Sequence, residues 1–164
     1  MDLFIIRHAW AGERDDEKYP DDALRPLTDE GRERFAKMVE FLVPRGLKPR
    51  VIATSPILRC RQTAEILAAA LGDKTKLVEC KHLLPGGDPK KLFAWTDEYA
   101  SGVEQAAWVG HAPDVGFIAA LLIGQEDGWM NFKKGAIAAI RSNDSPDFGR
   151  GELQWLVTAK VLGV

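Results

Sequence analysis

Short apolar runs, bounded by polar residues or glycine, recur along the chain and predict buried β-strands. Four of them are largely apolar throughout, as expected of strands that are covered on both faces: 3–6, 51–54, 106–109 and 136–140. Residues 153–158 predict a last strand, which would form a hairpin with 136–140 across the loop 142–151. A weaker pattern at 77–79 predicts one further short strand.

Between these strands, apolar residues recur at helical spacing. Thr28 is a predicted N-cap, and the following apolar positions share one helix face until Pro44 and Gly46 end the helix. Ser55 is predicted to cap a second helix that has Pro56 in its first position and extends to residue 71. Two more helices are predicted at 89–100 and 113–123.

Strands that alternate with helices of this length predict an α/β fold. We expect a three-layer α/β/α sandwich with a mostly parallel central sheet and one antiparallel edge strand. At 164 residues, with no repeat or linker, the chain predicts a single domain over 1–164. Ligands of such sheets bind beyond the carboxyl ends of the strands.

Composition and charge narrow the function classes. The chain is 46% hydrophobic and 28% charged, with no apolar run long enough to cross a membrane and no signal-peptide core, so a cytoplasmic protein without membrane contact is expected. The net charge of −2 argues against nucleic acid as a partner. Cys60 and Cys80 cannot form a disulfide framework.

The predicted strand ends bring chemistry to one edge of the sheet. Arg7 and His8 follow the first strand, Arg59 lies one turn into the helix after the second, and His111 follows the strand 106–109. A neutral imidazole is a nucleophile, and planar guanidinium groups suit a phosphoryl group. Each residue alone fits an ordinary strand end or helix cap; together they predict a phosphoryl site. Arg61 should point elsewhere and be solvated.

The motifs that carry these residues resemble a known family. Arg7-His8 after an apolar strand, Ser55-Pro-x-x-Arg59-x-x-Gln62-Thr63-Ala64 and Gly110-His111 are similar to the histidine phosphatase superfamily. Within it, Arg25-Pro-Leu-Thr28-x-x-Gly31 and the segment 84–88 most resemble the SixA phosphohistidine phosphatases. The resemblance covers residues 3 to about 140. One departure is Ala9, where the superfamily has glycine after the nucleophilic histidine.

The resemblance implies a phosphoglycerate-mutase-like fold and a metal-independent phosphatase without a cofactor. His8 would attack phosphorus, while a backbone carbonyl holds its other ring nitrogen. Arg7, Arg59 and a protonated His111 would stabilise charge on the phosphoryl oxygens, and Arg25 would lie beside the pocket. Water would then hydrolyse the phosphohistidine.

The resemblance leaves the acid and the substrate open. Glu79, His82 and Asp88 are candidates for the acid that protonates the leaving group. The expected partner is a protein that carries phosphohistidine, since a nitrogen leaving group tolerates a weak acid. The alternatives are a small phosphorylated substrate at the same site, or a non-catalytic phosphate-binding module.

Other polar and aromatic features have simpler interpretations. His8, His82 and His111 lack the spacing of a zinc site. The acidic residues of the segment 15–22 indicate a solvated loop or a surface that attracts a basic partner. Trp10 is expected to line the pocket, and the other four tryptophans to pack in or near the core.

Overall fold

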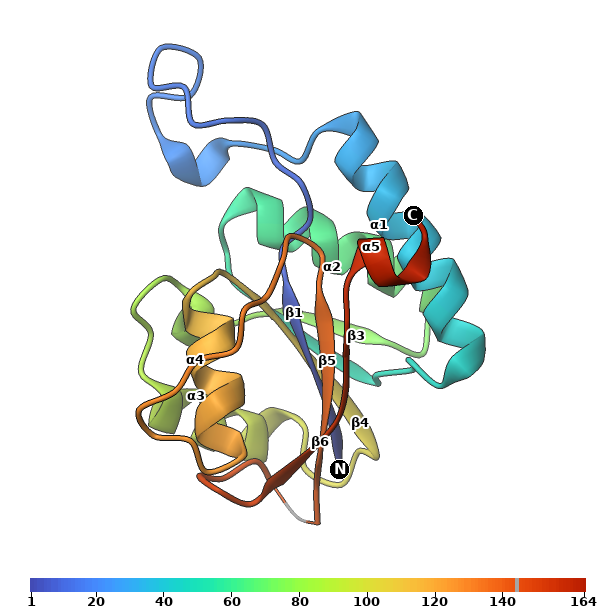
Figure 1. The fold of residues 1–164 in the computed structure, drawn as a ribbon, viewed down its shortest axis with the longest axis vertical. Helices are drawn as coiled ribbons and strands as arrows, with labels where there is room; N and C mark the ends of the chain where they lie inside the picture. The colour runs from blue at the N-terminus through green and yellow to red at the C-terminus, as the bar shows by residue number, and fades with distance from the viewer. Residues whose placement is uncertain (144) are drawn as a thin grey trace.

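A six-stranded sheet lies between two layers of helices in the computed structural model, which describes residues 1–143 and 145–164 (Figure 1). The strand order is β3-β2-β4-β1-β5-β6. The strands are β1 (Asp2–Arg7), β2 (Val51–Thr54), β3 (Lys76–Glu79), β4 (Gln105–Gly110), β5 (Ile137–Ser142) and β6 (Gly151–Val157). The helices are α1 (Asp29–Leu42), α2 (Leu58–Leu71), α3 (Pro89–Tyr99), α4 (Asp114–Leu122) and α5 (Ala159–Leu162), with 3₁₀ turns η1 (Asp22–Leu24), η2 (Val43–Arg45) and η3 (Lys81–Leu83).

The sheet is mostly parallel, as predicted. Strand β4 pairs in parallel with β1 and β2, and β2 pairs in parallel with β3. Strand β5 is antiparallel to both β1 and β6. The antiparallel strand β5 therefore lies inside the sheet, whereas the sequence predicted an antiparallel strand at its edge. A hairpin reverses the chain direction a second time, so β6 lies outside β5 and runs with β1.

Alternate residues of each strand face different helix layers. On β1, Leu3 and Ile5 belong to the core beneath α3 and α4. Phe4 and Ile6 belong to the core beneath α1, α2 and α5. Figure 1 shows the two helix layers on either side of the strands. Burial on both faces explains why these strands read as continuous apolar runs.

The helix starts test the predicted caps. Thr28 accepts a 3.0 Å hydrogen bond from the Gly31 N–H and caps α1, as predicted. The predicted cap at Ser55 is wrong, because α2 begins at Leu58 and has no side-chain cap. The short α5, capped by Thr158, was missed because four residues give no helical periodicity.

Two further observations concern the chain as a whole. No helix in the described part of the chain is long and apolar enough to cross a membrane. The predicted loop 142–151 includes residue 144, which lies outside the described residues.

Candidate active site

A cleft of about 400 Å³ lies where the parallel strands end. Its lining includes all five residues singled out from the sequence: Arg7, His8, Arg25, Arg59 and His111. The sequence did not predict the other lining residues, which come from connecting loops: Ala11, Gly12, Glu13, Arg14, Pro85, Ala112 and Lys134. The structure therefore brings together the four residues predicted at this edge of the sheet, and Arg25, which the resemblance placed beside the pocket, lines the cleft as well.

The imidazole of His8 is fixed by the residue that follows it. Its Nδ1 lies 2.8 Å from the Ala9 carbonyl oxygen, which can only accept, so Nδ1 carries the proton. This contact with a backbone carbonyl was predicted. Burial lowers the pKa of His8 to about 3, so the ring is neutral at pH 7. A neutral imidazole with Nδ1 protonated has its lone pair on Nε2.

The guanidinium groups of Arg7 and Arg59 are held by backbone carbonyls. Arg7 Nη1 donates to the Phe132 oxygen at 2.7 Å, and Arg59 Nη1 donates to the Asp22 oxygen at 3.0 Å. In both groups Nε is buried without a hydrogen-bond partner among the described residues. Leaving a buried donor unsatisfied costs stability, so holding these two guanidinium groups at the cleft is not explained by packing alone.

Asp22 connects two of the cleft arginines. Its carboxylate lies 2.7 Å from Arg25 Nε and 3.2 Å from Arg59 Nη1. Arg25 Nη1 also donates to the Gly12 carbonyl. The sequence placed Asp22 in a solvated acidic run, and no signal separated it from Asp21, which caps η1. The arginines lower the pKa of Asp22, with the Arg25 hydrogen bond as the main cause, so it stays ionised.

The remaining residues of the Ser55–Ala64 motif support the cleft from α2. Thr63 Oγ1 accepts the Ala9 N–H at 3.0 Å and donates to the Arg59 carbonyl at 2.7 Å. Gln62 Oε1 accepts the Leu27 N–H at 2.8 Å and so holds the segment after Arg25. The spacing of the motif therefore reflects a scaffold for the loops around His8.

Two small residues, Gly31 and Ala9, lie where the chain is closely packed near the nucleophile. A Cβ at Gly31 would lie 2.3 Å from the Trp10 carbonyl oxygen, which explains the glycine in the Arg25–Gly31 motif. Ala9 is fully buried and does not have a positive φ, so its methyl group causes no backbone strain. Trp10 does not line the cleft; its ring packs against the Arg34 guanidinium at 4.4 Å and against Gly135.

His111 is neutral, contrary to the prediction that it is protonated. Its pKa is lowered to about 4, chiefly by burial and then by the charge of Arg59. The ring centroid lies 5.4 Å from that of His8. His111 Nε2 lies 2.9 Å from Ser55 Oγ, which explains why Ser55 does not cap α2.

The three candidates for the leaving-group acid are absent from the lining of the cleft. Glu79 forms an ion pair with Arg61 at 3.4 Å on the surface, and Arg61 is solvent-exposed as predicted. Asp88 accepts a hydrogen bond from the Lys90 N–H and caps α3. His82 also lies outside the lining residues. No group of three or more His, Cys, Asp or Glu side chains in the described chain is arranged to hold a metal ion.

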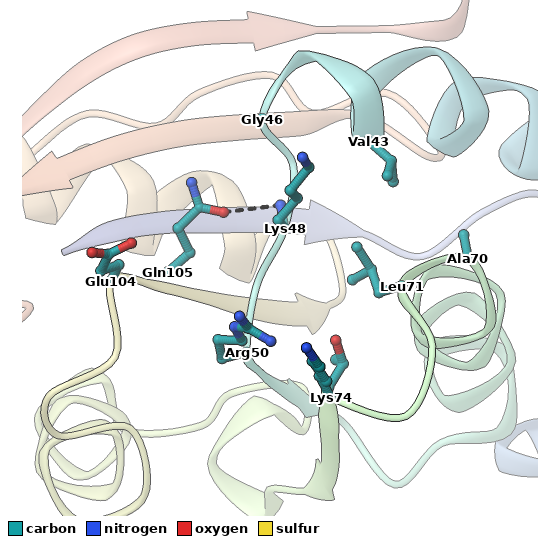
Figure 2. Close-up of a pocket in the computed structure, with 10 residues that line it drawn as sticks. Val43, Gly46, Lys48, Arg50, Ala70, Leu71, Lys74, Glu104 and Gln105 are labelled. Carbon is teal, nitrogen blue, oxygen red and sulfur yellow. Dashed lines mark hydrogen bonds between the residues drawn. The ribbon is translucent and has the colours of Figure 1, made fainter.

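A second cavity, of about 380 Å³, lies at the amino ends of β2 and β4 (Figure 2). Its charged lining residues are Lys48, Arg50, Lys74 and Glu104. Lys74 follows the carboxyl end of α2, where a cation interacts favourably with the negative end of the helix dipole. The cavity has no histidine or cysteine among its lining residues, and the Thr75 hydroxyl donates to the Pro49 carbonyl, so the imidazole nucleophile lies at the other end of the sheet.

Comparisons with known proteins agree with this geometry. The model of the histidine phosphatase superfamily (branch 1) matches residues 3–83. An uncharacterized protein of Picosynechococcus sp. (strain PCC 7002) is 39% identical over 145 residues, 87% of this chain and 86% of that protein. Phosphohistidine phosphatase SixA of Escherichia coli (strain K12) is 29% identical over 156 residues, 94% of this chain and 92% of that protein.

The chain belongs to the histidine phosphatase superfamily. A structure of the protein histidine phosphatase SixA complexed with tungstate superposes on this histidine phosphatase with a TM-score of 0.85, at 27% identity over 99% of both chains. The family, the α/β fold class and the phosphatase class predicted from the sequence are confirmed.

Proposed function

We propose that this histidine phosphatase transfers a phosphoryl group to His8 Nε2 and then to water, and that its substrate is phosphohistidine on a partner protein. The residues 1–164 would act as one catalytic domain. The observation that carries the proposal is the 2.8 Å contact between His8 Nδ1 and the Ala9 carbonyl, in a cleft lined by two guanidinium groups. That contact leaves Nε2 as the nucleophile.

In the first step, Nε2 attacks phosphorus and the bond from phosphorus to the leaving nitrogen breaks. The electron pair goes to the leaving imidazole, which takes up a proton from solvent water. The phosphorylated His8 ring carries a positive charge, and its Nδ1–H donates more strongly to the Ala9 carbonyl. The Arg7 and Arg59 guanidinium groups donate to the equatorial oxygens, where charge develops.

In the second step, water attacks phosphorus and the bond to Nε2 breaks. The electron pair returns to Nε2, and inorganic phosphate leaves. The lowered pKa of His8 keeps the ring a neutral, good leaving group and nucleophile at pH 7. Neither step needs a metal ion, since the guanidinium groups supply the positive charge.

Two structural observations and one similarity support a phosphohistidine substrate. The predicted acids lie outside the cleft, and Glu13 is the one carboxylate among its lining residues, which suits a leaving group that departs readily. The segment between Arg59 and His111 consists of the rest of α2, then β3, η3, α3, β4 and their connections, so it adds no further helix to the fold that could cover His8. SixA, which the chain resembles, is named a phosphohistidine phosphatase.

The test compares substrates and traps the intermediate. Purified protein is assayed on a phosphohistidine-bearing carrier protein, on phosphoserine peptides and on sugar phosphates. We expect kcat/KM to be highest for phosphohistidine, and rapid quenching in alkaline detergent to yield a labelled protein whose label survives in alkali and is lost in acid. His8→Ala should yield no label and no turnover, while its circular dichroism spectrum is unchanged.

Each alternative gives a different result. A preference for sugar phosphates would identify a small-molecule phosphomonoesterase and overturn the protein substrate. Binding of phosphate without label or turnover on any substrate would identify a phosphate-binding module and overturn the enzymatic proposal.

A further inference from the structure

Two fully buried side chains contact the imidazole of His111. Ser55, directly after β2, places its Oγ 2.9 Å from Nε2. Cys60, in the first turn of α2, places its Sγ 3.3 Å from the same nitrogen. Both side chains are 0% exposed, and His111 is 4% exposed. Nε2 is therefore held inside the protein, away from solvent.

Both neighbours of Nε2 are able to donate a proton to it. Ser55 Oγ accepts the Ile57 N–H at 3.4 Å, which leaves its own hydroxyl proton for another acceptor. Burial raises the pKa of the Cys60 thiol to about 12, so the thiol keeps its proton at neutral pH. Neither neighbour is a carboxylate, the group that stabilises a protonated ring nitrogen in Ser-His-Asp triads. The surroundings of Nε2 thus favour a lone pair on this nitrogen.

With a lone pair on Nε2, the second ring nitrogen of His111 carries the proton. A neutral imidazole has one N–H, and Nδ1 has no polar partner nearer than the Cys60 Sγ at 3.8 Å among residues 1–143 and 145–164. The opposite tautomer would leave a lone pair on Nδ1, and a lone pair repels phosphoryl oxygens. Only the Nδ1–H tautomer gives this side of the cleft a donor.

We propose that Ser55 is a positioning residue that holds His111 as the Nδ1–H tautomer, so that the neutral ring donates this N–H to a phosphoryl oxygen. The donation of this N–H to a phosphoryl oxygen rests on the function proposed above. Ser55 acts through His111 and does not touch the substrate. A neutral donor needs control of its tautomer, whereas a protonated histidine would not, because both of its nitrogens would donate.

The tautomer can be read without any substrate. The chain has three histidines, so long-range ¹H–¹⁵N correlation spectra of uniformly labelled protein are simple, and His111→Gln assigns the ring by difference. We expect Nδ1 to be the protonated nitrogen in the free protein and with inorganic phosphate as the probe. In Ser55→Ala, the Nε2–H tautomer should become populated.

Kinetics supply the second measurement. Ser55→Ala should lower kcat about tenfold and change KM by less than about twofold, because a donor in the transition state is lost. Ser55→Thr, which keeps the hydroxyl group, should recover most of the activity. Ser142→Ala is the matched control: Ser142 is also buried but lies at the end of β5, and its removal should leave kcat unchanged.

The outcomes separate this proposal from the proposed function. A protonated Nε2 in the unmodified protein would overturn the role of Ser55, and so would an Ser55→Ala variant with unchanged tautomer and kcat. If Ser55→Ala does not fold, the spectrum of the unmodified protein still decides. Absence of turnover on every phosphorylated substrate would overturn the proposed function, whatever the tautomer.

Discussion

Both ends of the parallel strands carry a cluster of cations, yet only one end is built for chemistry. At the carboxyl ends, Arg7 and Arg59 are held by backbone carbonyls, and each has a buried Nε without a partner in the described chain. At the amino ends, Lys48, Arg50 and Lys74 are exposed around the cavity of Figure 2. The two cavities have similar volumes, about 400 and 380 Å³.

The difference shows that positive charge and a cavity do not make a phosphoryl site. Exposed lysines are solvated and mobile, so they do not aim donors at one point in space. The guanidinium groups at the cleft are fixed before any substrate arrives, which is what electrostatic catalysis requires. Preorganised donors beside a neutral nucleophile are therefore the feature to test.

The largest expected effect comes from replacing the planar guanidinium group of Arg59. Arg59→Lys keeps the charge but removes the planar donors, so kcat/KM should fall roughly 100-fold or more. Arg61→Lys is the matched control on the same helix, since Arg61 pairs with Glu65 and Glu79 on the surface and should change kcat/KM less than about twofold. Equal losses in both variants would contradict the assignment of Arg59 to the site.

The strand ends explain how much of this site the sequence could predict. His8, Arg59 and His111 follow or lie just beyond apolar runs whose carboxyl ends meet at one edge, so parallel topology alone brings them together. Thr28 was a recognisable cap because its side chain bonds a backbone group three residues away. Local patterns of this kind are visible in a sequence.

Other features depend on tertiary contacts that no local pattern records. Ser55 resembles a helix cap, yet its hydroxyl bonds His111, a residue far along the chain. Asp22 is one of several loop carboxylates, and only the fold brings it to Arg25 and Arg59. The neutral state of His111 depends on burial, which lowers its pKa and is set by the whole fold.

Acid should destabilise the cleft end of the molecule. Burial lowers the pKa of His8 to about 3 and of His111 to about 4, whereas both titrate near 6.5 when unfolded. Between those values the unfolded chain binds more protons, so stability is complete above pH 6.5 and is lost as pH falls toward 4. From pH 7.5 to 5.5 each histidine should cost about 1.4 kcal/mol, a tenfold change in the unfolding equilibrium.

Denaturant unfolding at the two pH values checks this prediction. His8→Ala removes one of the two groups, so it should lose about 1.4 kcal/mol less than the unmodified protein between pH 7.5 and 5.5. Arg50→Ala, at the amino end, should show the same pH dependence as the unmodified protein. An unchanged dependence in His8→Ala would mean that His8 is not buried as a neutral ring.

A smaller effect is expected from Asp22, which holds two of the cleft arginines. Asp22→Asn removes the negative charge and replaces one of the two oxygens that face Arg25 Nε and Arg59 Nη1 by an amide group, so KM should rise about fivefold with a smaller change in kcat. Asp21→Asn is the control, since asparagine also caps η1. A fall in KM would mean that Asp22 acts mainly as an anion that competes with the phosphoryl group.

The smallest effect should come from the amino end. Replacing Lys48, Arg50 and Lys74 together by alanine removes three positive charges from exposed side chains, and Lys134 is also exposed. The kcat and KM of this triple variant should change less than about twofold at 0.15 M salt, because charges far from the cleft are screened. Lys134→Ala removes one charge that lines the cleft and should raise KM two- to threefold. If the triple variant raised KM as much as Lys134→Ala, the overall field would matter more than the fixed donors around His8.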